Sequence, residues 1–132
     1  MIDIEPDVFS ELGEYIAGYY PDLKGENEIL MNPPILPCWC MEEISNTSDM
    51  TTVDSHSNEN YANVDYEVRV YVHPAFGKRR EARKIMGHID TWFINKGFDR
   101  INTSFIAFDD GTKFQVICQY SAKTDGKTIY RR

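Results

Sequence analysis

The 132-residue sequence contains few of the residues that carry chemistry, with only three cysteines and three histidines. No apolar run approaches the roughly 20 residues that cross a bilayer. The acidic start of the chain also lacks the basic residues and apolar centre of a secretion signal. We therefore expect a soluble protein with no membrane partner, made in a reducing cytoplasm with free cysteines, because an odd number of cysteines excludes complete internal pairing.

Two of the cysteines, Cys38 and Cys40, flank a tryptophan shortly after three prolines. Structural zinc sites use about four ligands, with paired cysteines usually two or more residues apart, and redox pairs are separated by two residues. One intervening residue fits neither pattern, and His56, His73 and His88 show no grouping with the cysteines. We expect no metal and no cofactor. The nearby prolines instead favour an edge strand, whose exposed edge could accept a neighbouring subunit.

Basic residues are almost absent from the first half of the chain. Residues 1–65 carry 14 acidic groups and one basic group, a net charge of -13, whereas residues 66–132 carry 7 acidic and 13 basic groups, a net charge of +6. In one interpretation, two faces of a single domain are solvated differently. In the other, an acidic surface of one subunit meets a basic surface of another copy, a head-to-tail contact that can close into a ring. The total charge of -7 argues against a reader of nucleic-acid sequence.

Apolar spacing predicts two helices. Residues 6–20 carry apolar side chains every three or four positions and are followed by Pro21. Residues 78–96 repeat this pattern and are followed by Gly97, which suits the left-handed end of a helix.

The remaining segments predict strands. Residues 64–73 alternate apolar and polar side chains, and Asp110-Gly111 indicates a tight turn within a hairpin. Residues 45–63 are polar and are expected to form a long mobile loop or an extended hairpin arm. The order of elements predicts one α+β domain over residues 1–132, with two helices packed on a mostly antiparallel sheet of four to five strands. These strands cover residues 35–44, residues 64–73, a hairpin within 98–122 and a short terminal strand at 127–132.

Five basic residues crowd the first turns of the second predicted helix, where the helix dipole disfavours positive charge. This cluster could contact phosphates or an acidic partner, although a solvated face would need no partner. We call it the basic cluster, and it comprises Lys78, Arg79, Arg80, Arg83 and Lys84.

Cys118 is the one candidate nucleophile, with His73 or His88 as the candidate base. It falls on the apolar face of a predicted strand, between Val116 and Tyr120. A buried cysteine usually behaves as a small hydrophobic side chain. We therefore expect a protein without enzymatic activity and keep a small cytosolic enzyme that uses Cys118 or a histidine as an alternative.

The second half of the chain resembles the small tail terminator (tail completion) proteins of long-tailed bacteriophages and prophages. The resemblance rests on the strand YEVRVYVH, the helix REARKIMGHIDTWF, the hairpin INTSFIAFDDGTKFQVICQYSA and the closing IYRR. It includes the Ile-Asp pair at Ile89 and Asp90 and the aromatic Tyr120 in the returning strand. An initial helix and a strand after prolines extend it loosely to the first half, and the polar segment 45–63 departs from a minimal version.

The resemblance implies a structural virion protein rather than a catalyst. Such proteins form a six-membered ring on the last ring of the tail tube, stop tube growth and present the surface that joins the head. The implied partners are further copies of the chain, the tail tube protein and a head-completion or connector protein, with DNA passing only through the ring lumen. The implied location is the virion tail, after assembly in the host bacterial cytoplasm. The basic cluster, Arg131 and Arg132 are then candidate subunit or tail interface residues, and a head–tail connector or other minor virion component is an alternative role.

Overall fold

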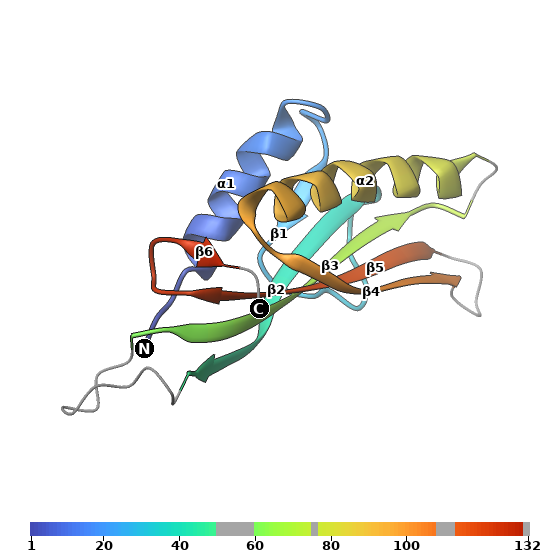
Figure 1. Cartoon of the computed structure of the whole chain (residues 1–132). Helices are drawn as coiled ribbons and strands as arrows, with labels where there is room; N and C mark the ends of the chain where they lie inside the picture. Colours follow the sequence, from blue (N-terminus) through green and yellow to red (C-terminus); the bar gives the residue numbers. More distant parts are fainter. Residues whose placement is uncertain (50–59, 75–76, 108–112, 131–132) are drawn as a thin grey trace.

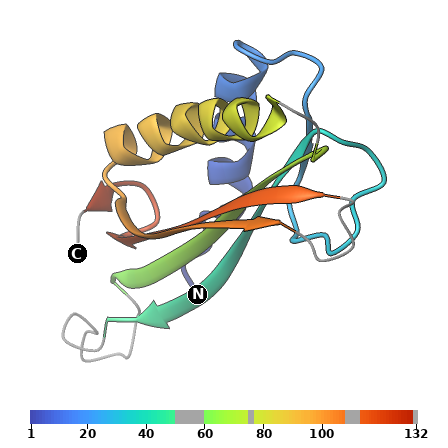
Figure 2. The ribbon, with the colours of Figure 1, turned by 90° about the vertical axis from the view of Figure 1, so that its right-hand side faces the viewer.

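The computed structural model describes residues 1–49, 60–74, 77–107 and 113–130 of the chain. Both helices lie on one face of a single sheet (Figures 1 and 2). This confirms the α+β class with two helices on a mostly antiparallel sheet, although the described sheet has six strands rather than four to five. The elements are α1 (Glu5–Ala17), β1 (Lys24–Glu26), β2 (Cys38–Ser48), β3 (Ala62–Val72), α2 (Lys78–Lys96), β4 (Asp99–Ala107), β5 (Phe114–Thr124) and β6 (Ile129–Tyr130).

The strands follow the spatial order β1-β2-β3-β5-β4, and the short β6 pairs with the end of β5. All neighbouring pairs are antiparallel except β1, which runs parallel to β2. β1 is the strand that the sequence did not predict, because its three residues are too few to show an alternating pattern. Its position makes β4 the last strand at the opposite edge.

The sequence predicts a long loop or an extended hairpin arm over residues 45–63, and the described ends of this segment fit the hairpin arm. β2 continues to Ser48, which pairs with Ala62 at the start of β3. The two strands therefore form a long hairpin (Figure 1). Residues 50–59 and the predicted turn at Asp110-Gly111 lie outside the described residues.

The main core lies between the helices and the sheet. The central strands direct every second side chain toward the helices, as their alternation predicts. Phe93 of α2 stacks on Tyr120 of β5, with ring centroids 4.2 Å apart and planes inclined by 5°. From the helices, the fully buried contributors are Leu12, Ile16, Ile85, Ile89 and Phe93.

A second, smaller cluster lies on the other face of the sheet. Cys38, Cys40 and Tyr71 are buried there beneath the loop that carries Leu30, and the Tyr71 hydroxyl donates a hydrogen bond to the Leu30 carbonyl at 2.7 Å. The neighbouring Cys40 thiol and burial raise the pKa of the Cys38 thiol. In the part of the chain that the structure describes, no group of three or more potential ligands could hold a metal ion. Both thiols are free and buried, and they pack with Tyr71 in this cluster.

The edge of β2 is occupied, so the expectation of an exposed edge on this strand is wrong. β1 pairs with the beginning of β2. Farther along, the Glu43 amide donates a hydrogen bond to the Glu5 carboxylate. The Asn46 side-chain amide donates to the Ile2 carbonyl at 2.7 Å. The N-terminal segment thus contacts this edge of β2, and the two ends of the strand order in the described sheet are the three-residue β1 and the nine-residue β4.

Candidate interaction surfaces

The strand order decides where the acidic and basic halves of the sequence lie in the sheet. β1 and β2 come from the acidic half of the chain and lie at one edge of the sheet, with α1 packed on β2. β5 and β4 come from the basic half and lie at the other edge, beneath α2. The two edges of the sheet therefore come from different halves of the sequence, although β6 of the second half lies beside α1 (Figure 1).

The basic cluster lies on the first two turns of α2, as predicted. Lys78 is paired with Glu81 at 3.1 Å. The Arg79 guanidinium lies 4.8 Å from the Phe114 ring centroid, and Arg83 lies 4.2 Å from that of Phe105. These arginines are thereby held against the end of the β4–β5 pair.

Two members of the cluster point away from these contacts. Arg80 and Lys84 are exposed and make no ion pair with any described residue. The helix N-terminus has no side-chain cap and one acidic residue in its first turn, so little local charge offsets the cluster. An acidic partner from outside the chain would offset it. The two arginines at the chain end, Arg131 and Arg132, lie outside the described residues.

An exposed acidic stripe lies on α1, at the other side of the molecule. Asp7, Glu11 and Glu14 are spaced four and three residues apart and so share one helix face, and all three are exposed. Glu11 pairs with Lys96 of α2 at 3.5 Å. We call these three residues the acidic stripe.

The candidate nucleophile Cys118 is buried and bonded to residues other than histidine. Its sulfur lies 3.4 Å from the Thr103 hydroxyl, and burial raises the pKa of the thiol. The candidate base His88 stacks on Tyr19 with ring centroids 4.0 Å apart, in the layer formed by the helices. The other candidate base, His73, is exposed just after the end of β3, whereas Cys118 is buried opposite Val68 of that strand. The structure therefore brings neither histidine to Cys118.

Sequence reasoning missed a groove between α2 and β4. A pocket of about 180 Å³ opens there, with Met86, Val116 and Cys118 among its apolar lining. The Asp90 carboxylate accepts a hydrogen bond from the Tyr120 hydroxyl at 2.9 Å. It also forms an ion pair with the Arg100 guanidinium at 3.5 Å. No periodic signal marks such a groove, because it arises only when an edge strand folds beside a helix.

No protein-family model and no curated protein matches this chain. Among the described residues, no helix is both long and apolar enough to cross a membrane. The functional argument therefore depends on the surfaces themselves.

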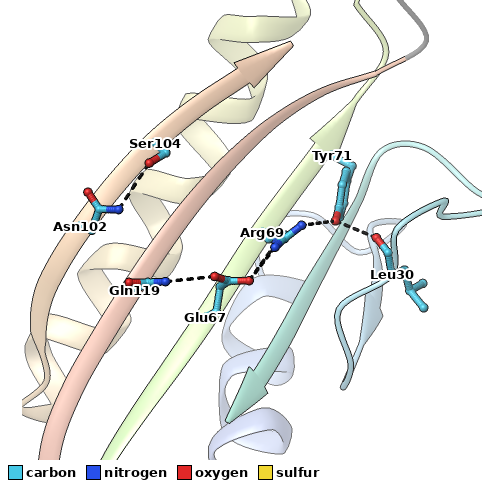
Figure 3. Close-up of polar contacts among 7 residues, drawn as sticks. All are labelled: Leu30, Glu67, Arg69, Tyr71, Asn102, Ser104 and Gln119. Carbon is cyan, nitrogen blue, oxygen red and sulfur yellow. Dashed lines mark hydrogen bonds and ion pairs between the residues drawn. The ribbon is translucent and has the colours of Figure 1, made fainter. Parts of the chain in front are cut away.

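The sheet face opposite the helices carries a line of polar contacts (Figure 3). Gln119 donates to Glu67 at 3.1 Å, and Glu67 pairs with Arg69 at 2.9 Å. Arg69 in turn donates to the Tyr71 hydroxyl at 3.4 Å. Glu67, Arg69 and Tyr71 lie along β3 and Gln119 lies on the neighbouring β5, so their polar groups satisfy one another on a face that no helix covers.

Glu43 is a titratable group with a defined role in the fold. Its carboxylate accepts a hydrogen bond from the buried Tyr66 hydroxyl at 2.9 Å. Burial raises the pKa of Glu43, and the negative charges of Glu5 and Asp3 act in the same direction. Because the folded state binds this proton more tightly than the unfolded chain does, the contribution of Glu43 to stability falls as the pH rises through the raised pKa.

We expect Glu43→Gln to stabilise the protein at pH 7 and to have less effect at pH 4. Glutamine still accepts the Tyr66 hydrogen bond but carries no charge. The expected gain is a few tenths of a kcal/mol, since the site is partly exposed and solvent screens the repulsion. Urea unfolding at both pH values measures it, with Glu42→Gln on the opposite sheet face as the control. A loss of stability at pH 7 that exceeds the loss at pH 4 would contradict this account.

Proposed function

We propose that this protein is a structural component of a phage tail, which assembles as a six-membered ring on the end of the tail tube. The ring ends tube growth and provides the surface that joins the head. The observation that carries this proposal is that the exposed acidic stripe lies on α1 and the exposed basic cluster lies on the first turns of α2. The family resemblance of the second half of the chain supports the identity of the assembly.

Two separate patches of opposite charge, one on α1 and one on α2, favour a head-to-tail contact over a symmetric one. In a two-fold symmetric contact between equivalent patches, each basic cluster would face another basic cluster, and like charges facing each other destabilise an interface. In a head-to-tail contact, the acidic stripe of one copy faces the basic cluster of the next. Repetition of one such contact generates a closed ring when the rotation between copies closes.

Arg80 and Lys84 are the members of the basic cluster best placed for this contact, because they are exposed and have no ion-pair partner among the described residues. Asp7 and Glu14 are their counterparts on the acidic stripe. A single exposed ion pair contributes only about 0.2–1 kcal/mol. Several pairs at every contact add up and also orient the copies as they approach one another.

The proposed ring belongs to the virion tail and assembles in the host bacterial cytoplasm. Its other partners are the tail tube protein beneath it and a head-completion or connector protein above it. DNA passes through the lumen without being bound. The net charge of -7 suits a lining that does not retain DNA.

The head-to-tail contact is tested by cross-linking with engineered cysteines. A variant with both Glu14→Cys and Arg80→Cys is mixed with tail tubes and treated with a bis-maleimide reagent. The three native cysteines are buried, so we expect the reagent to react with the two introduced cysteines. We expect a ladder of covalent species that ends at six copies.

The single variants Glu14→Cys and Arg80→Cys serve as matched controls. Neither residue meets its own equivalent in a head-to-tail contact, so neither variant should form a ladder. A covalent dimer from one of the single variants would show a symmetric contact and would contradict the proposed ring geometry.

A further inference from the structure

The open edge of β4 is the starting point. In the described sheet β4 pairs only with β5, so its other edge presents backbone N–H and C=O groups that no strand uses. Ile101 and Phe105 on this strand are 57% and 47% exposed. Proteins usually protect an edge strand with charge, proline, a β-bulge or a covering element, and in β4 the charges and the register shift lie near its beginning, between Asp99 and Asn102, which leaves Thr103–Ala107 regular. An edge left open beside a groove is suited to strand addition.

Gly87 forms part of the groove wall and lies in the middle of α2. Glycine inside a helix is unfavourable relative to alanine. A Cβ atom at Gly87 would have nothing within 4 Å, so no contact within the described chain requires glycine there. Its effect is to leave space above the pocket, where a side chain would narrow the groove.

The groove lining carries two arginines and one carboxylate, Asp90, so its charge is net positive above a partly apolar floor. Arg83 of α2 and Arg100 of β4 both line the pocket. Arg83 lies against Phe105, and Arg100 is anchored by Asp90. An acidic side chain placed between the two arginines would find a charge-assisted hydrogen-bond donor on either side.

We propose that this groove binds an extended segment of a partner protein, which adds to β4 as a further strand and places an acidic side chain between Arg83 and Arg100. Main-chain hydrogen bonds would provide affinity, and the pocket would select the acidic side chain. This inference goes beyond the ring contact, which uses the opposite face of the basic cluster.

A second copy of the chain is a poorer occupant than a different protein. Two β4 edges paired with each other would bring Arg83 and Arg100 of both copies together. The N-terminal segment, which is acidic and extended, is already held on β2 of its own chain through Ile2 and Glu5.

The test is a titration of the ¹⁵N-labelled protein with a nine-residue peptide of alternating threonine and valine that carries one central glutamate. We expect the amide signals of β4 and of the first half of α2 to shift and to saturate. The same peptide with a central lysine should bind at least about tenfold more weakly, because it meets Arg83 and Arg100 with like charge.

Two protein variants refine the test. Gly87→Leu fills the space above the pocket and should weaken peptide binding at least about tenfold, while the open surroundings and the higher helix propensity of leucine keep the fold intact. Lys127→Glu makes a charge change far from the groove, in the turn before β6, and should bind the peptide as the native protein does.

Several outcomes would overturn the proposal. These are the absence of β4 shifts at about 1 mM peptide, equal binding of the lysine peptide, and undiminished binding by Gly87→Leu. Shifts at β4 that depend on protein concentration in the absence of peptide would identify a second copy as the occupant and would equally overturn it. None of these outcomes bears on the ring, which the cross-linking experiment tests separately.

Discussion

The double variant Arg80→Glu and Lys84→Glu should fail to cap tail tubes, and adding Asp7→Lys and Glu14→Lys in the same chain should restore capping. The first pair of changes turns two attractive contacts between neighbouring copies into repulsive ones. At about 0.5 kcal/mol lost and about 0.5 kcal/mol of repulsion gained for each pair, every contact loses about 2 kcal/mol, or about thirty-fold in affinity. A ring multiplies this loss over all its contacts.

The readout is the fraction of tubes that carry a cap in negative-stain electron micrographs. Lys24→Glu is the control, since it reverses an exposed positive charge on β1 that belongs to neither the basic cluster nor the acidic stripe, and it should leave capping unchanged. High salt should also lower the fraction of tubes capped by the native protein, because it screens the attraction between the charged surfaces. Normal capping by the Arg80→Glu and Lys84→Glu variant would contradict the proposed contact. Failure of the variant with all four substitutions to restore capping would contradict it as well.

Trp39→Ala should destabilise the fold by about 3–5 kcal/mol, the usual cost of truncating a large buried aromatic side chain. Trp39 is 2% exposed and packs against Phe9 of α1 with ring centroids 5.2 Å apart. Its indole also lies against Gly25 of β1, where a Cβ atom would come within 2.6 Å. The truncation therefore opens a cavity where α1, β1 and β2 meet.

Urea unfolding followed by far-ultraviolet circular dichroism measures this loss. Ile44→Ala is the control, because Ile44 lies in the same strand and is 47% exposed, so its truncation should cost less than about 0.5 kcal/mol. A cost below about 1 kcal/mol for Trp39→Ala would show that this junction of α1 with the sheet is not tightly packed.

Elements with strong local signals could be predicted closely from the sequence. α2 spans Lys78–Lys96 as expected, because glycines bound it on both sides and its apolar stripe is regular. The strand expected at residues 64–73 became β3 with a shift of two residues or fewer at either end. By contrast, α1 ends at Ala17 rather than at residue 20, since Gly18 follows.

Features that depend on long-range pairing could not be predicted. β1 is a strand only because its three residues pair with the start of β2. The contact at the β2 edge depends on a hydrogen bond between Glu5 and Glu43, which are almost forty residues apart in the sequence. The basic cluster could be found in the sequence, because five positive charges lie at the beginning of a predicted helix, where the helix dipole disfavours them. The groove was not, because Arg83 and Arg100 come together only through the pairing of β4 with β5 beneath α2.

The most direct test of the proposed function is electron microscopy of the purified protein mixed with tail tubes. The account predicts additional density on one end of each tube, with six-fold symmetry in end-on averages, and no further elongation of capped tubes when tube protein is added. Bare tube ends and continued elongation at saturating protein concentration would contradict it.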